Sequence, residues 1–358
     1  SRMWPHIDFA DGKLILSWVE SGKDDPSQQT LMFAESTDLG ESFAEPSPLS
    51  SDSAVRPTFV GADADESGRV VATWLDHRHD VQQPFAANSD ENGTDQLVYA
   101  GPDEQGICPC CDLDIKNASD GSTLIAFRNS IGGYRDMWIC FRAKGESQFS
   151  PPQPVVEPRW EFNGCPHDGP SMAIIGNQVH IVWMDAHTGV QQVYYGKAKI
   201  GEWNFEVKPV SPSTSAQSHA NLIAHDDRLW ISWDESGTAS THHDHAHTES
   251  SGSNSLIMLA SSVDGGNTFS PHGAISNDVE GLGSRPTLLQ SAESLPDQSD
   301  GENERRRNQN GCDHGEEGED EELRIQPENR GTRLHHLPAV GKLGHERTSP
   351  ANRVSSTC

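Results

Sequence analysis

Short apolar runs that end in an aromatic residue recur along the first 290 residues of the chain. Five such runs follow polar turns containing Asp, Gly or Asn, and they occupy residues 13–18, 69–74, 122–127, 178–183 and 228–233. Their closing aromatics are spaced 56, 53, 56 and 50 residues apart, at Trp18, Trp74, Phe127, Trp183 and Trp233. Runs this short predict β-strands, and no ten-residue stretch has helical periodicity. The pattern therefore indicates an all-β protein.

A second β-rich stretch follows most of these runs, at residues 31–34, 137–140, 193–195 and 256–260. Several short strands repeated at a period of about 50 residues are typical of a β-propeller blade. A sixth unit starts at residues 283–290 and then loses the pattern. We predict a six-bladed β-propeller over residues 1–290, with five complete blades and an interrupted sixth.

Two turns share the pattern S-x-D-x-G-x-[ST]-F, at residues 36–43 and 262–269. This pattern resembles the Asp box, or BNR repeat, of the sialidase superfamily, which implies a sialidase-like propeller. Asp38 and Asp264 are expected to accept hydrogen bonds from backbone amides of the turn, and the glycine to take a positive φ. We therefore assign both aspartates a structural role and not a catalytic one.

Residues 291–358 form a tail of different composition. All 11 Phe, 9 Trp and 4 Tyr of the chain precede this tail. A segment without aromatic residues buries too little apolar surface to offset the entropy lost on ordering. We predict a low-complexity, disordered tail, with a frameshift in the sixth blade as the alternative.

Net charge and cysteine content limit the possible binding partners and the compartment of the protein. With 54 acidic and 26 basic residues the formal net charge is −28, which disfavours nucleic acids and anionic lipid surfaces. No run approaches the ~20 apolar residues that span a bilayer, so no membrane insertion is expected. The seven cysteines, three of them within residues 108–111, favour an oxidising compartment or a metal site. We expect a monomer in the periplasm or outside the cell, with a signal peptide missing from this chain.

The candidate site lies where the blades open. The first strand of each propeller blade lines the central channel, so the residues that open these strands should meet at one mouth. In this chain the openings are residues 2–6, 55–57, 108–111, 164–167, 218–219 and 284–286. We expect a small molecule, a glycan or a metal ion to bind there.

Two of these openings carry distinctive motifs, Cys-Pro-Cys-Cys at 108–111 and Asn-Gly-Cys-Pro-His at 163–167. They resemble turns of a bacterial subset of sialidase-like propeller proteins, in which an arginine strand lies between the two. The matching positions are Cys108, Cys110, Cys111, Arg128, Asn129, Arg135, Asp136, Asn163, Gly164, Cys165, Pro166, His167, Gly169 and Pro170. The resemblance covers about residues 1–290 and supports architecture more than activity.

Thiolates beside an imidazole suit a soft metal ion such as copper(I) or zinc. The candidate ligands at the mouth are Cys108, Cys110, Cys111, Cys165, His167 and His219. Structural disulfides between channel strands are the main alternative, and a redox thiol pair is another. Cys140 lies in an apolar strand, where we expect a buried and inert thiol.

A histidine run in the fifth blade offers a separate metal hypothesis. Its members are His242, His243, His245 and His247. Imidazoles at this density bind copper, nickel or zinc with little need for a fold. A solvated loop that captures metal adventitiously explains the run equally well.

Active sialidases, which this chain resembles in fold, use three arginines to hold a carboxylate, an Asp as acid or base, and a Tyr nucleophile. The positions available for such roles are Arg56, Arg128, Arg135, Arg285, Asp76, Asp136 and Tyr134. The first-strand F/Y-R-I-P phrase of sialidases is absent, and the late-chain positions of the tyrosine and last arginine fall in the tail.

Three functions remain open at this point. The first is an exported, non-hydrolytic propeller whose Cys/His mouth binds a soft metal or a redox partner. The second is a glycoside hydrolase of the exo-α-sialidase type. The third is a binding or scaffold propeller with structural disulfides only. We favour the first.

Overall fold

The computed structural model describes residues 2–10, 12–23, 25, 29–51, 56–91, 94–236, 255–276 and 285–288, together with the backbone of 325–326. These residues all belong to the first of two compact units, Ser1–Glu328. The predicted tail, 291–358, lies outside the described residues apart from the short strand at 325–326.

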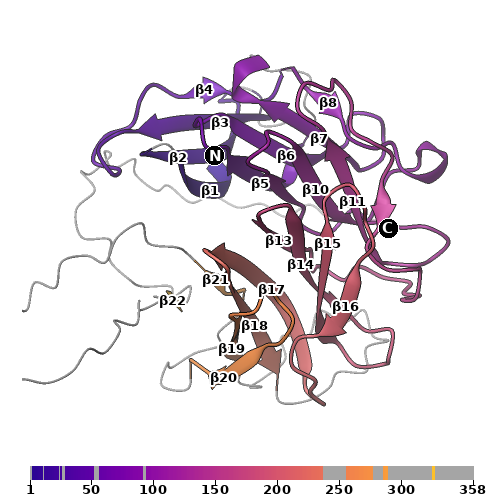
Figure 1. Ribbon diagram of the computed structural model, residues 1–358. Helices are drawn as coiled ribbons and strands as arrows, with labels where there is room; N and C mark the ends of the chain where they lie inside the picture. The colour runs from indigo at the N-terminus through magenta and orange to yellow at the C-terminus, as the bar shows by residue number, and fades with distance from the viewer. Residues whose placement is uncertain are drawn as a thin grey trace, which may run out of the picture. The chain divides into compact units, whose positions relative to one another are not determined.

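Five four-stranded antiparallel sheets follow one another along the chain (Figure 1). The first contains β1 (Arg2–Ala10), β2 (Lys13–Ser21), β3 (Gln29–Ser36) and β4 (Ser47–Pro48). The second contains β5 (Thr58–Ala64), β6 (Val70–Asp76), β7 (Gln83–Asn88) and β8 (Gln96–Leu97). The third contains β9 (Asp114–Asn117), β10 (Thr123–Arg128), β11 (Met137–Arg142) and β12 (Gln153–Pro154).

The fourth sheet contains β13 (Ser171–Ile175), β14 (Gln178–Asp185), β15 (Gln192–Lys199) and β16 (Glu206–Pro209). The fifth contains β17 (Ala216–His225), β18 (Arg228–Ser236), β19 (Ser255–Ser262) and β20 (Ser270–Ala274). A sixth, two-stranded sheet pairs β21 (Thr287–Leu288) with β22 (Ile325–Gln326). Two 3₁₀ turns, η1 (Ser89–Glu91) and η2 (Pro102–Glu104), are the helical elements of the described chain. The all-β propeller with five complete blades and an interrupted sixth is confirmed.

The predicted runs are the second strands of the blades, and their tryptophans lie between neighbouring sheets. Trp74, Trp183 and Trp233 are at most 1% exposed. Apolar clusters join the sheets in pairs, and one of them packs Leu124 and Met137 of the third sheet against Ile181 and Trp183 of the fourth. The second, third and fourth sheets have an apolar cluster on each face, and their second strands β6, β10 and β14 are buried along almost their whole length, which explains the strong sequence signal.

A repeated hydrogen bond ties the innermost strands together. In each case a side-chain oxygen on the first strand of one blade accepts from a backbone N–H on the first strand of the next. The pairs are Asp8 with Ala64, Asp63 with Asn117, Asp114 with Met172, Ser171 with Leu222, and Asn221 with Leu288. These bonds fix the height of each first strand relative to its neighbour, and therefore the relative positions of the loops that open them.

The two Asp-box turns have the same internal network. The Asp38 carboxylate accepts from the Ser42 N–H at 2.9 Å, and Asp264 accepts from the Thr268 N–H at the same distance. Hydrogen bonds from the Ser42 hydroxyl and the Ser42 N–H lower the pKa of Asp38 to about 2. The backbone hydrogen bonds expected for both aspartates are confirmed.

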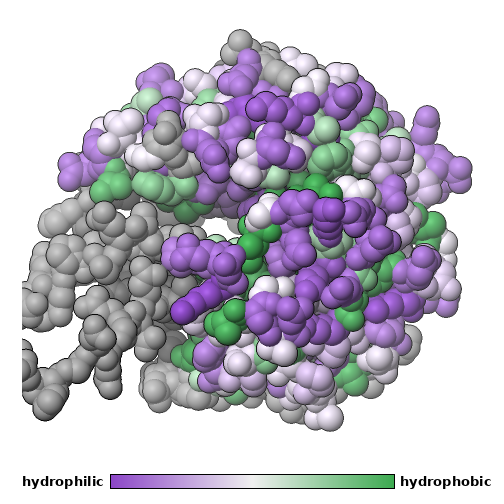
Figure 2. Space-filling model, in the orientation of Figure 1, coloured by the Kyte–Doolittle hydropathy of each residue, from purple (hydrophilic) through white to green (hydrophobic). Residues whose placement is uncertain are grey.

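The face shown in Figure 2 is mostly hydrophilic, with apolar residues in small separate patches. Scattered apolar residues of this kind are normal on a protein surface. No helix in the described part of the chain has the length and apolarity to cross a membrane.

Candidate metal centre

Three thiols converge in the loop that precedes β9. The Cys108 sulfur lies 3.8 Å from that of Cys110 and 3.6 Å from that of Cys111, and all three residues are buried. They form an apolar cluster of their own. All five cysteines among the described residues are free thiols in this structure.

The loop before β13 brings a second pair of ligands to the same place. The donor atoms of Cys110, Cys165 and His167 all lie within 4.8 Å of one another. Cys165 and His167 are exposed, whereas Cys110 is buried. Two cysteine motifs separated by more than fifty residues therefore meet, as the sequence predicted for the openings of adjacent blades.

Close backbone contact explains why glycine follows this second motif. A Cβ on Gly169 would lie 2.4 Å from the Asp112 oxygen and 2.8 Å from the Asp112 carbonyl carbon. Any larger residue would push the 165–168 loop away from the 108–112 loop. Gly169 thus sets the distance between the two groups of ligands.

Arg128 forms hydrogen bonds with both loops. Its guanidinium donates to the main-chain oxygens of Asp168, Arg135 and Met184 at 3.0, 2.7 and 2.8 Å. The Arg128 oxygen accepts from the Cys108 N–H at 3.2 Å. The side chain is 1% exposed, so it holds backbone and does not face an open carboxylate-binding site as a sialidase arginine would.

Electrostatics favour a thiolate at Cys108. Hydrogen bonds from the Cys110 and Cys111 thiols, together with the positive charge of Arg128, lower the pKa of Cys108. Hydrogen bonds with the Cys108 sulfur, together with burial, raise the pKa of the Cys110 and Cys111 thiols. Thiolates are the form in which cysteine binds metals.

His219 belongs to a neighbouring carboxylate network. Its Nδ1 lies 2.9 Å from Asp234, and its N–H donates to Asp168 at 2.6 Å. Burial lowers the pKa of His219, but the Asp234 hydrogen bond and the charges of Asp168 and Asp234 outweigh it and raise that pKa. His219 is in neither group of possible ligands found among the described residues, so the structure does not bring it to the thiols.

Asp168 and Asp112 were not among the sequence candidates. Asp168 is 1% exposed, and its Oδ1 has no hydrogen-bond partner in the described structure. Burial raises the pKa of both carboxyls. Asp168 is the variable residue between His167 and Gly169, so its place inside the motif was the one available signal.

Arg285 of the sixth blade reaches the same loops. Its guanidinium lies 3.5 Å from the Asp112 carboxylate and donates to the His167 oxygen at 3.3 Å. The side chain is 53% exposed, and both contacts are therefore weak. Contacts thus link the openings of blades three to six, four of the six openings that the sequence predicts at one mouth.

The other glycosidase candidates lie apart from the thiols. Arg56 is exposed and has no ion pair with the cluster among the described residues. Arg135 donates to the Ser130 hydroxyl at 2.6 Å, and Tyr134, 36% exposed, pairs through its backbone with Glu161. Arg135 also donates to the main-chain oxygen of Tyr134, its chain neighbour, at 3.4 Å, and no contact among the described residues joins Arg56 to either of them.

Asp76 and Asp136 are both buried and both hydrogen-bonded. Asp76 accepts from the Trp74 indole at 3.0 Å and forms a 2.6 Å ion pair with Arg78. Asp136 accepts from the backbone of Arg159 and Trp160 at 3.0 and 3.3 Å. Burial raises the pKa of Asp136. These contacts are those of residues that stabilise the blade ends.

Two further expectations concern metal and thiol chemistry elsewhere. His242, His243, His245 and His247 lie outside the described residues. Cys140 is buried in the apolar cluster between the second and third sheets, and burial raises its pKa to about 12. The predicted burial of Cys140 is confirmed, and the inertness of its thiol stays a prediction.

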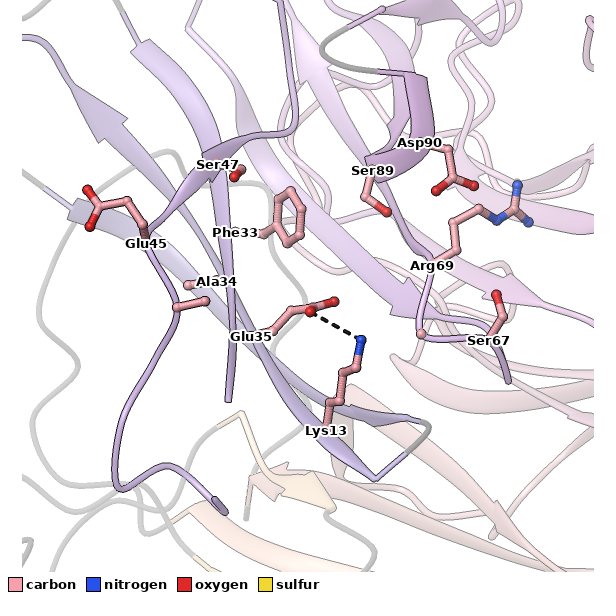
Figure 3. Close-up of a pocket in the computed structure, with 12 residues that line it drawn as sticks. Lys13, Phe33, Ala34, Glu35, Glu45, Ser47, Ser67, Arg69, Ser89 and Asp90 are labelled. Atoms are coloured by element: carbon pink, nitrogen blue, oxygen red, sulfur yellow. Dashed lines mark hydrogen bonds and ion pairs between the residues drawn. The ribbon is translucent and has the colours of Figure 1, made fainter. Parts of the chain in front are cut away.

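A separate cavity of about 380 Å³ lies between the first two sheets (Figure 3). Its lining includes the Lys13–Glu35 ion pair at 3.2 Å, with Arg69 and Asp90 on the opposite side. The lining is mainly polar and contains no cysteine or histidine. This cavity offers no chemistry comparable with the thiol cluster.

No protein-family model and no curated protein matches the chain. Among solved structures it is similar to the Hadza microbial sialidase Hz136, with 16% identity and a TM-score of 0.47 over 80% of this chain. It is also similar to an unknown-function protein from Dyadobacter fermentans (13% identity, TM-score 0.45, 68% of this chain and 74% of that one). A third similar structure is the GH93 α-L-arabinofuranosidase of Fusarium graminearum, with 9% identity and a TM-score of 0.46 over 67% of this chain and 72% of that one. The chain spans 61% of the length of the sialidase.

Proposed function

We propose that this protein is an exported, sialidase-like propeller whose cysteine cluster binds a soft metal ion, copper(I) or zinc. The observation that carries the proposal is the spacing of the thiols. Metal–sulfur bonds of about 2.3 Å at tetrahedral angles place two sulfurs about 3.8 Å apart. The Cys108 sulfur lies 3.8 and 3.6 Å from those of Cys110 and Cys111.

The surroundings of the cluster also support metal binding. Loops from neighbouring blades hold the sulfurs, and Arg128 anchors the Cys108 backbone and supplies a positive charge beside the thiolates. A buried group of thiolates needs such compensation, because unpaired charge away from water is costly. Bound metal would supply the remainder.

The sulfur spacing argues against the main alternative. A disulfide requires sulfurs about 2.05 Å apart, which these loops reach only by moving inward. Export is part of the proposal because the crowding of cysteines suits an oxidising compartment, where a bound ion protects thiolates from oxidation.

Metal content and thiol state together test the proposal. Full-length protein, purified without added metal chelators, should contain copper or zinc, and its cluster thiols should react with a thiol reagent only after the metal is removed. A Cys111→Ser variant should lose that metal, while Cys140→Ser should keep it. Metal-free protein whose thiols become reactive only after reduction would refute the proposal in favour of disulfides.

A glycosidase assay tests the competing function. Arg128, Asp76 and Asp136 are committed to hydrogen bonds within the fold, so we expect no turnover of a fluorogenic sialoside. Turnover that is lost in Tyr134→Phe and kept in Cys111→Ser would instead support a hydrolase.

A further inference from the structure

The possible metal ligands form two groups that share one sulfur. The first group is Cys108, Cys110 and Cys111, and the second is Cys110, Cys165 and His167. Within each group the donor atoms lie within 4.8 Å of one another. We infer that the cluster holds two metal ions bridged by the Cys110 thiolate, an inference that rests on the proposed metal-binding function.

Bond lengths exclude a single ion with all five ligands. Two sulfurs on opposite sides of one ion are at most about 4.6 Å apart when each bond is about 2.3 Å. The five donor atoms do not form one group within 4.8 Å; they divide into two. One ion therefore satisfies either group, and occupation of both requires a second ion.

The two positions differ in their access to water. All three ligands of the first group are buried, which is typical of a closed site. In the second group Cys165 and His167 are exposed, so an ion held there keeps an open coordination position. We assign the inner ion a tightly held role and the outer ion an exchangeable one.

Charge balance favours the second ion. Four metal-bound thiolates would carry four negative charges, and the Asp168 carboxyl, 1% exposed, lies in the same loop as Cys165 and His167. One copper(I) ion together with Arg128 and Arg285 would leave excess negative charge at a partly buried site. A second cation reduces this excess.

Three ligands at each position suit copper(I), which accepts two or three donors, more readily than zinc, which takes four. The inner site would have three sulfurs, and the outer site two sulfurs and one imidazole nitrogen. Copper(I) is accordingly the probe for the test.

The test is a titration of reduced, metal-free protein with copper(I) under anaerobic conditions, in competition with a chromogenic chelator. The full chain is used with His242, His243, His245 and His247 changed to Ala and Cys312 and Cys358 to Ser, because these residues would otherwise add adventitious binding. We expect two equivalents bound, the first at least tenfold more tightly than the second. X-ray absorption should show a metal–metal scattering path only when both are present.

Variants separate the two positions. Cys165→Ser and His167→Ala should each lose the weaker equivalent, lose the metal–metal path and retain the tighter equivalent. Cys140→Ser, which removes a thiol outside the cluster, should retain both. If the protein with intact Cys165 and the Cys165→Ser variant both bind one equivalent of copper(I), the inference of a second ion is wrong and the proposed metal-binding function still holds. No bound copper(I) in any protein would overturn the proposed function itself.

Discussion

The Arg128 guanidinium donates a hydrogen bond of 2.8 Å to the main-chain oxygen of Met184, across the boundary between the third and fourth sheets. Two further carbonyls accept from the same group. An arginine that the sialidase resemblance suggests for substrate binding is here a clamp between blades. Because the Arg128 main-chain oxygen accepts a hydrogen bond from the Cys108 N–H, we expect the position of the thiol cluster to depend on this arginine.

Replacing Arg128 by Met should destabilise the protein by about 3 kcal/mol or more, because it removes the Arg128 donor from three carbonyl oxygens, two of them in buried hydrogen bonds, and each loss costs roughly 1–3 kcal/mol. Urea unfolding followed by tryptophan fluorescence measures the change. Arg228→Met, at an exposed position at the start of β18, is the control and should cost less than about 0.5 kcal/mol. Equal stability of the two variants would contradict the clamp.

Gly169→Ala should separate the two groups of ligands. The added Cβ would lie 2.4 Å from the Asp112 main-chain oxygen, so the 165–168 loop must move outward. This movement takes Cys165 and His167 away from Cys110. Copper(I) titration should show loss of the weaker equivalent with the tighter one retained. Gly176→Ala in the β13–β14 turn, where the Cβ meets nothing within 4 Å, should keep both. Two equivalents in Gly169→Ala would show that this contact does not position the loop.

The second strands of the blades could be predicted from sequence because their central residues are buried and mostly apolar. β7 was not predicted, since Gln83–Asn88 has Phe85 as its one large apolar residue and its burial comes from neighbouring sheets. The outer strands β4, β8 and β12 have two residues each, too few to show a period.

The candidate site, like the strands, was predicted from the sequence only in part. Motif spacing identified Cys108, Cys110, Cys111, Cys165 and His167, because propeller topology brings the openings of adjacent blades together. It did not reveal that Arg128 binds carbonyls or that His219 pairs with Asp234, since both depend on tertiary partners. A motif specifies which side chains approach, and packing decides what each contacts.

The Asp-box glycine of the fifth blade offers a test with a matched neighbour. A Cβ on Gly266 would lie 1.7 Å from the Tyr195 hydroxyl, whereas one on Gly265 meets nothing within 4 Å; both have positive φ. Gly265→Ala should cost about 1–2 kcal/mol of backbone strain. Gly266→Ala should cost at least 2 kcal/mol more, measured by chemical unfolding. If the two variants unfold at the same denaturant concentration, the glycine serves only the backbone and not the approach of Tyr195.

His180 should make stability depend on pH. It is fully buried in β14, its Nδ1 lies 2.6 Å from the Tyr195 hydroxyl, and burial lowers its pKa from 6.5 to about 4. Between these values the unfolded chain binds more protons than the folded one, so the free energy of unfolding rises with pH. The contribution is present above pH 6.5 and is lost as pH falls towards 4, by about 3 kcal/mol in all.

Unfolding measured at several values between pH 4 and 7 tests this dependence. In His180→Phe the free energy of unfolding should change by about 3 kcal/mol less between pH 4 and 7 than in the wild type, because the titrating group is gone. Tyr195→Phe removes the hydrogen-bond partner and keeps the burial, so it should lower stability at every pH while preserving the slope. The same slope in wild type and His180→Phe would assign the pH dependence to other groups, whereas a flat curve in Tyr195→Phe would make the hydrogen bond, and not burial, the cause.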